Sequence, residues 1–255
     1  MLIVISPSKT LEPYNGPTRM PLTNHRFKTH TKVLVTLLQN KSKEELANFM
    51  SLSHTLAEQN FERFQQFYKS TNTYSAAILT FKGELYNGLQ AEAMSEESLS
   101  YANHHLRILS GLYGSLRPSD KIVPYRLEMG SRLQTDRGTN LYHFWSESIT
   151  ASMNDDLRKS GSEFLANLAS DEYFKVLNTK ALKAKVIHFD FYEMRNGKRT
   201  FVSFNAKKAR GLMASYIINN KIREIDQLVN FNSEGYQYDV EASHPFNLVF
   251  TRFSK

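Results

Sequence analysis

Residues 108–130, ILSGLYGSLRPSDKIVPYRLEMG, organise the chain on either side of them. The segment starts as an apolar run that predicts a short buried strand, and it breaks at Gly111 and Gly114, which permit turns and close backbone approach. Pro118 and Pro124 exclude a continuous helix across the remainder. Between these rigid points stand charged and aromatic residues, namely Arg117, Lys121, Arg126, Glu128, Tyr113 and Tyr125. Such a stiff loop is a common scaffold for a site, but an ordered connection with solvated arginines fits it equally well.

The composition describes an ordinary globular protein. The 255 residues, 41% hydrophobic and 12% aromatic, suffice for a substantial core in one large domain or two small ones. The absence of cysteine excludes disulfides, thiolate catalysis, iron–sulfur clusters and cysteine-type zinc sites. None of the eight histidines shows the i, i+4 spacing of a helical metal pair. We therefore expect no metal site and no cofactor.

No apolar stretch is long enough to cross a bilayer. The N-terminal run MLIVISPSKT is too short for a signal peptide and lacks a basic segment before it. We expect a cytoplasmic protein without a membrane partner. Nothing in the sequence indicates an oligomeric state.

The positive charge is concentrated in one part of the chain. Residues 175–223 hold twelve lysines and arginines against two acids, Asp190 and Glu193, an excess of ten, whereas the whole chain has a net charge of +7. The remainder is therefore slightly acidic. Segregated positive charge predicts a polyanionic partner, nucleic acid first and an anionic membrane second.

The first strand is expected at residues 2–5, where four apolar residues precede Pro7. The following loop, residues 6–10, holds hydroxyl groups and Lys9 directly after that strand, but it lacks the glycines of a phosphate-binding loop. Lys9 could supply the point charge in one wall of an anion site, and a simple polar turn is the alternative.

A pair of short helices is expected next, after a helix over residues 23–39. Ser42 and Glu45 form a capping-box pattern before one helix, and the other begins near Ser53. The outline over about residues 43–69 matches a helix-hairpin-helix, in which the hairpin contacts DNA phosphate. Serines stand where the motif normally has glycines, at Ser51 and Ser53, so an ordinary helical hairpin is the alternative. Gly111 to Gly114 is a competing position for the motif.

Further elements follow in order. We expect a strand at residues 76–81, and we expect Lys82, Glu84 and Tyr86 beyond it to share a cleft with Lys9, because strand ends collect sites in α/β folds. A helix over residues 95–107 should begin at Ser95. An amphipathic helix over residues 140–154 and a strand over residues 163–168 come next.

The last third of the chain contains its clearest hairpin. Asn196-Gly197 supplies the positive φ angles of a type I′ turn between two strand-like runs. Asn205 is a suitable N-cap for a following helix over residues 205–220. Two strand-like runs, residues 236–240 and 246–253, end the chain. No repeat or linker interrupts it, so we expect residues 1–255 to form a single mixed α/β (α+β) domain.

The segments SGLYGSLRP and PYRLEMG resemble the signature of the YaaA peroxide-stress protein family. Five other blocks are similar to the same family and span nearly the whole chain in order: ISPSKTLE (5–12), FKGELYNGLQA (81–91), LYHFW (141–145), NLASDEYF (167–174) and SFNAKKARGLMA (203–214). The resemblance implies a DNA-binding protein linked to oxidative-stress defence and recombinational repair. It also implies an unusual fold with a basic cleft and a helix-hairpin-helix.

Together these features lead to one main hypothesis and one rival. The main hypothesis is a protein that binds DNA, as duplex or repair intermediate, through phosphate contacts in a basic cleft without base-sequence preference. The expected contacts are Lys9, Lys82, Arg117, Arg126, Lys207, Lys208 and Arg210 in the cleft, and Met50, Ser51, Leu52, Ser53 and His54 in the hairpin. The rival is a lyase- or glycosylase-like enzyme acting on nucleic acid or nucleotide, with a Schiff-base lysine and an acid–base pair drawn from Lys9, Tyr86, Glu128, Glu172 and Lys208. We assign no catalytic residue.

Overall fold

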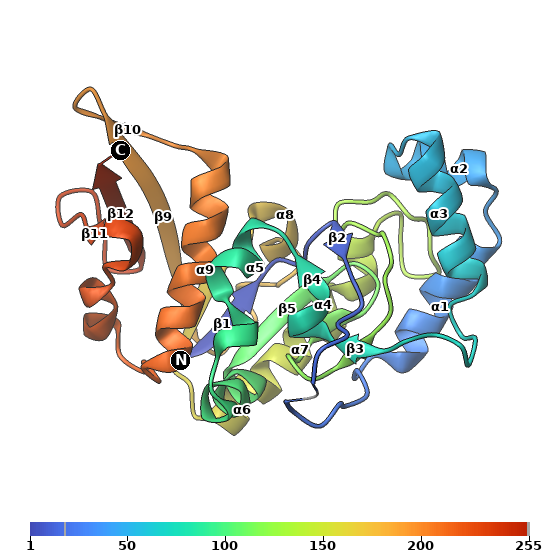
Figure 1. Cartoon of the computed structure of the whole chain (residues 1–255), viewed down its shortest axis with the longest axis horizontal. Helices are drawn as coiled ribbons and strands as arrows, with labels where there is room; N and C mark the ends of the chain where they lie inside the picture. The colour runs from blue at the N-terminus through green and yellow to red at the C-terminus, as the bar shows by residue number, and fades with distance from the viewer. Residues whose placement is uncertain (18, 254–255) are drawn as a thin grey trace.

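A mostly parallel β-sheet runs through the centre of the computed structural model, which describes residues 1–17 and 19–253 (Figure 1). Eight strands of the described chain form this sheet, in the order β11-β12-β9-β8-β1-β5-β6, with β10 paired to β9. Their bounds are β1 Leu2–Ile5, β5 Leu106–Ser110, β6 Gly114–Leu116, β8 Phe164–Leu168, β9 Lys185–Arg195, β10 Lys198–Thr200, β11 Gln237–Tyr238 and β12 Asn247–Phe253. Short pairs outside it are β2 Thr10–Leu11 with β4 Phe81–Lys82, and β3 Ser75–Ala76 with β7 Lys121–Ile122.

The helices surround the sheet and also build a separate bundle. Their bounds are α1 Lys28–Gln39, α2 Lys43–Met50, α3 His54–Gln65, α4 Ala77–Thr80, α5 Glu84–Leu89, α6 Glu96–His105, α7 Leu141–Ser160, α8 Asp171–Phe174 and α9 Ser203–Asn219, with short 3₁₀ turns at Ala91–Ala93, Ile225–Asn230 and Ser233–Gly235. Figure 1 shows α9 in front of the sheet and α7 behind it. The expected mixed α/β fold in a single domain is confirmed. No helix in the described residues is long and apolar enough to span a bilayer.

The central strand β1 fixes where a site can form. All four of its residues are fully buried, as expected for a parallel strand covered on both faces. Ile5 lies opposite Ile108 of β5 on one side and Leu168 of β8 on the other, so the three carboxyl ends meet at one edge. The chain leaves β1 for β5 and later returns through α7 as β8, on the other side of β1. This reversal is the kind of switch point at which open α/β sheets bind ligands.

The segment 108–130 has the compact, turn-rich form that its glycines predict. The buried strand is confirmed as part of β5. A Cβ on Gly111 would lie 2.4 Å from the carbonyl oxygen of Leu127, and Gly114 has φ +76°. Trp145, fully buried in α7, donates a hydrogen bond of 2.8 Å to the Gly111 carbonyl. This segment is thereby fixed against the core on both sides of its turn.

Helices α5 and α9 cross with their backbones in contact. A Cβ on Gly211 would lie 1.8 Å from the carbonyl oxygen of Leu85, and a Cβ on Gly88 would lie 2.1 Å from that of Lys208. No other residue type fits at either position without moving a helix. The crossing therefore sets the position of the first turns of α9 relative to the start of α5.

A buried ionic cluster joins the segment before α1 to the sheet. Asp156 of α7 accepts two hydrogen bonds from Arg107 of β5 and two from Arg26, at 2.6–2.8 Å. Burial alone would raise the pKa of Asp156, but the two guanidinium groups more than offset it and hold that pKa below 3.8. The cluster anchors the base of the arm that carries α1, α2 and α3.

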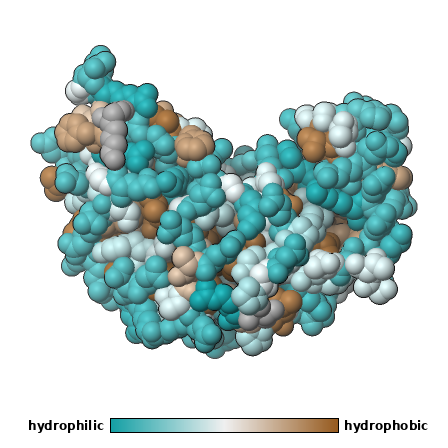
Figure 2. Space-filling model, in the orientation of Figure 1, coloured by the Kyte–Doolittle hydropathy of each residue, from teal (hydrophilic) through white to brown (hydrophobic). Residues whose placement is uncertain are grey.

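The molecule has two arms with a hollow between them (Figure 2). One arm holds β9, β10, β11, β12 and α9, and the other holds the helical bundle α1–α3. In the bundle, the predicted capping box of Ser42 and Glu45 is present, and the Ser53 side chain accepts from the amide of Leu56. Ser51 adopts the left-handed conformation, φ 52°, that a glycine would supply. The two helices and their short connection are thus confirmed. The helix-hairpin-helix motif and its contact with DNA stay predictions.

Three local predictions were wrong. Residues 77–80 form the helical turn α4 rather than a strand, because a short buried apolar run does not distinguish the two. Helix α1 begins at Lys28 rather than at residue 23, since Thr23 instead bridges to Asp120. Asn205 is no N-cap: α9 begins at Ser203, and the Asn205 side chain donates to Glu193.

Two other local predictions were correct. Ser95 caps α6, and its hydroxyl accepts from the amide of Ser98. The turn between β9 and β10 is the expected one, with Asn196 and Gly197 both at positive φ. Local side-chain chemistry decides both features, which is why the sequence pattern is sufficient for them.

Candidate functional site

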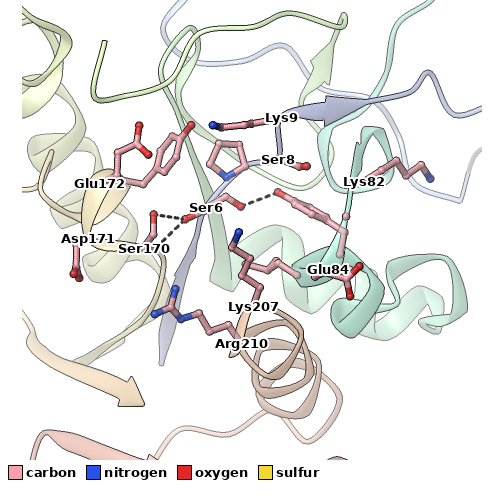
Figure 3. Close-up of a pocket in the computed structure, with 15 residues that line it drawn as sticks. Ser6, Ser8, Lys9, Lys82, Glu84, Ser170, Asp171, Glu172, Lys207 and Arg210 are labelled. Atoms are coloured by element: carbon pink, nitrogen blue, oxygen red, sulfur yellow. Dashed lines mark hydrogen bonds between the residues drawn. The ribbon is translucent and has the colours of Figure 1, made fainter. Parts of the chain in front are cut away.

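A crevice of about 630 Å³ opens at the carboxyl ends of β1 and β8 (Figure 3). Four segments line it: the loop after β1, the turn from β4 into α5, the start of α8 and the second turn of α9. The lining residues are Ser6, Pro7, Ser8, Lys9, Lys82, Gly83, Glu84, Leu85, Tyr86, Ser170, Asp171, Glu172, Tyr173, Lys207 and Arg210. All of them fall within four of the family-like blocks noted above.

Hydrogen bonds tie the floor of the crevice together. The Ser6 hydroxyl accepts from the amide of Ser170 at 2.9 Å and contacts the Ser170 hydroxyl at 3.3 Å. The Tyr86 hydroxyl donates to the Ser6 carbonyl at 3.0 Å. Burial raises the pKa of Tyr86 well above 10, so this phenol stays protonated and remains a donor. The serines and the tyrosine therefore hold the β1 loop against α8 and α5.

The turn into α5 approaches the β1 loop closely because it contains a glycine. Gly83 has φ +112°, and a Cβ there would lie 3.2 Å from the Ser8 hydroxyl oxygen. A side chain would be strained at this φ and would also crowd Ser8. Gly83 thus helps to close the wall of the crevice opposite α8.

Three lysines reach the crevice in different ways. The Lys9 side chain is 66% exposed, and its ammonium lies 3.6 Å from Glu128. Lys207 is exposed and points into the centre of the crevice in Figure 3, and none of the described acids forms an ion pair with it. Lys82 turns away from the centre and pairs with Glu92 at 2.9 Å. Lys207 and Lys9 are therefore the lysines placed to meet an anion in the crevice.

Arg210 is the fourth cation of the site. It is partly buried at the crevice wall, and within the described chain its guanidinium has neither a hydrogen-bond partner nor an ion pair. Burial lowers the pKa of Arg210, and the more distant carboxylates of Asp171 and Asp190 only partly offset this. A desolvated guanidinium with unused donors favours an anion with several acceptor oxygens.

Acidic side chains share the crevice with these cations. Glu84, Asp171 and Glu172 line it alongside the four basic residues. Glu172 is held in place by accepting from the amide of Gly130 at 3.0 Å, and Glu84 accepts from Asn87 at 3.2 Å. Asp171 has no ion pair within the described chain. The crevice is therefore mixed in charge, and the basic cleft that the family resemblance implies stays a prediction.

The structure brings together four of the predicted cleft residues, Lys9, Lys82, Lys207 and Arg210. The expectation that Glu84 and Tyr86 share a cleft with Lys9 is also confirmed, although the strand expected before them is a helical turn.

The other predicted contacts lie outside the crevice. Arg126 pairs with Glu128, the same carboxylate that lies near Lys9. Arg117 is bound to the buried Asp120 and to the carbonyl of Asn24, which gives it a structural role. Lys208 pairs with Glu234. The segment from Met50 to His54 belongs to the bundle arm and runs from the last residue of α2 to the first residue of α3.

Ion pairs also reduce the number of unpaired cations in residues 175–223, the segment in which the positive charge is concentrated. Arg195, Arg199, Lys208 and Lys221 pair with Glu193, Asp239, Glu234 and Glu97, three of which lie outside residues 175–223. The charge count overstated the potential of this region, because acids distant in the sequence fold back onto it. In the part of the chain that the structure describes, no group of three histidine or acidic side chains has the arrangement of a metal site.

Sequence reasoning placed Ser6 in a polar loop that could form one wall of an anion site, and it left Ser170 and Asp171 open between acid–base and helix-capping roles, but it did not select these three residues as contacts. Each follows a predicted strand, at residue 5 or 168, and the carboxyl ends of neighbouring parallel strands converge. The missing information was the pairing of β1 with β8, which joins segments more than 160 residues apart. With that pairing, the two polar loops could have been placed together.

The comparison with known families agrees with the blocks that surround the crevice. The family model for peroxide stress protein YaaA matches residues 1–242, nearly the whole chain. The match includes every residue of the crevice and both arms up to the end of β11. The chain therefore belongs to the peroxide stress protein YaaA family.

Proposed function

We propose that this peroxide-stress family member is a cytoplasmic DNA-binding protein that contacts backbone phosphates without reading base sequence, in the setting of DNA repair. The observation that carries the proposal is the pair Lys207 and Arg210, two cations at the crevice without carboxylate partners among the described residues. Phosphate oxygens would satisfy the guanidinium and the ammonium together. Lys9 adds a third charge from the loop after β1.

The two arms leave a hollow between them (Figure 2), and in this proposal the DNA reaches the crevice through that hollow. The bundle arm would then supply secondary contacts through residues 50–54, where the hydroxyls of Ser51 and Ser53 lie at exposed positions. Residues 43–69 hold three lysines or arginines against four glutamates, so these contacts would add little electrostatic attraction. The crevice side carries the main share of phosphate binding in this proposal.

Salt titration with duplexes of unrelated sequence tests the proposal. Affinity should fall steeply with salt, because each phosphate contact releases counterions, and it should vary little between sequences. Fluorescence anisotropy at four or more salt concentrations measures both properties. Flat salt dependence, or no binding at low salt, would refute phosphate-backbone binding.

An enzyme acting on nucleic acid or nucleotide is a second candidate, because Lys9, Tyr86 and Glu172 do share the crevice and Glu128 lies next to Lys9. A Schiff-base lysine needs desolvation or a neighbouring cation, whereas Lys9 is largely exposed and faces a carboxylate. Borohydride trapping with abasic-site DNA should therefore yield no Lys9 adduct. An adduct that forms with the wild type and is absent with Lys9→Ala would instead support an enzyme that uses Lys9 as a Schiff-base nucleophile.

A further inference from the structure

The crevice is small and mixed in charge, whereas a continuous DNA backbone is long and uniformly anionic. Its volume of about 630 Å³ falls in the range of small-ligand pockets, roughly 300–1,000 Å³. A duplex can lie across its mouth but cannot enter it. The interior of the crevice therefore has the volume of a small-ligand pocket, into which a single nucleotide would fit.

The acidic side chains of the crevice indicate which other ligand groups would be bound there, next to an anion held by the cations. Glu84 and Asp171 stand on opposite walls, on α5 and α8, with Lys207 and Arg210 between them in Figure 3. Carboxylates repel a run of phosphates, but they accept hydrogen bonds from base amino groups and sugar hydroxyls. A lining of four basic and three acidic side chains fits a ligand that has one anionic group and several neutral donors.

We infer that the crevice binds a single unpaired nucleotide, with its phosphate at Arg210 and Lys207 and its sugar or base donors at Asp171 and Glu84. The inference deepens the proposed function and rests on it, since the nucleotide would be a unit of bound DNA that has left the helix. Extrusion costs least where a base lacks a partner, so the site selects DNA that already contains an unpaired base.

The test uses two duplexes of identical sequence, one of which has a single extra unpaired nucleotide. The wild-type protein should bind the bulged duplex about tenfold more tightly, a gain that corresponds to roughly one net charge-assisted hydrogen bond. In the variant Glu84→Gln with Asp171→Asn this preference should disappear, while intact-duplex affinity should stay equal or rise because two repulsive charges are gone. If the crevice binds phosphate alone, the same double variant should bind both duplexes more tightly, and the ratio of the two affinities should not change.

The matched control removes two exposed acids elsewhere, Glu163→Gln with Glu241→Gln, and it should retain the tenfold preference. Equal affinity of the wild type for both duplexes would overturn the inference and leave the proposed function standing.

Titration with deoxyadenosine 5′-monophosphate, followed by NMR or calorimetry, measures nucleotide binding by the crevice independently of duplex binding. Binding that weakens in Glu84→Gln with Asp171→Asn supports a nucleotide site, even if the protein fails to bind duplex. No binding at millimolar concentration overturns the inference. Inorganic phosphate that competes as well as the nucleotide would also overturn it, since the site would then recognise phosphate alone.

Discussion

The crevice and the helical hairpin are the two regions that sequence patterns nominate for DNA contact, and they are built differently. The hairpin α2–α3 is one continuous stretch, residues 43–65, held by local caps. The crevice collects four segments between residues 6 and 210, held by strand pairing and by the α5–α9 crossing. The hairpin has a motif outline with little positive charge, whereas the crevice has cations that lack carboxylate partners in the described chain. Long-range packing, rather than local pattern, places the chemistry in this protein.

The largest expected effect concerns the anchor beneath the bundle arm. Asp156→Asn leaves Arg107 and Arg26 without a counter-charge and should lower the free energy of unfolding by about 3–5 kcal/mol. The folded-state pKa of Asp156 is depressed, so its contribution is full above about pH 3.8 and is lost as pH falls through the lower folded value. The difference between wild type and variant in urea unfolding should therefore be constant above about pH 4 and shrink below it. A pH-independent difference would show that ion pairing is not its cause.

The next effect separates the two regions directly. Gly211→Ala puts a methyl group into the carbonyl of Leu85 and should cost ~3 kcal/mol, because neither helix backbone can rotate away. It should also weaken DNA binding, since α5 and α9 both contribute lining residues to the crevice.

Ala47→Gly in α2 is the matched change in the hairpin. It should cost about 1 kcal/mol through helix propensity alone and leave DNA affinity unchanged. Denaturant unfolding and anisotropy measure both variants. An equal loss of affinity in the two would contradict the assignment of the main contact to the crevice.

These contrasts also explain how far the sequence alone could lead. Periodicity and turn chemistry predicted most strands and helices, because the 196–197 turn, the Ser42 cap and the apolar run of β1 are decided locally. The helical turn at residues 77–80 was missed because its four residues are buried in either conformation.

The site was predicted only in part. Lys9, Lys82, Lys207 and Arg210 were chosen as cations near strand or helix ends, and they do meet. Arg117 was chosen as a charged residue on the stiff loop within residues 108–130, but a buried carboxylate three residues away, Asp120, binds it. Which cation remains free depends on ion pairs formed across the fold, and a single sequence does not contain that information in local form.

A smaller effect is expected from the hairpin itself. Ser51→Asp with Ser53→Asp puts negative charge where phosphate would lie, while aspartate can still cap α3 and tolerates the left-handed conformation at position 51. DNA affinity should fall about threefold, an exposed-charge effect, with thermal stability nearly unchanged. Unchanged affinity would remove residues 50–54 from the interface and leave them as a packed helical pair.

The central claim is that phosphates are bound at the crevice, and the slope of log affinity against log salt tests it most directly. This slope is negative, and Lys207→Gln with Arg210→Gln should reduce its magnitude by about two. Each phosphate that is no longer bound makes the slope shallower by close to one. Lys43→Gln with Lys69→Gln removes the same charge from the bundle arm and should leave the slope unchanged. The reverse result, an unchanged slope for the crevice pair and a reduced slope for the bundle pair, would contradict the account.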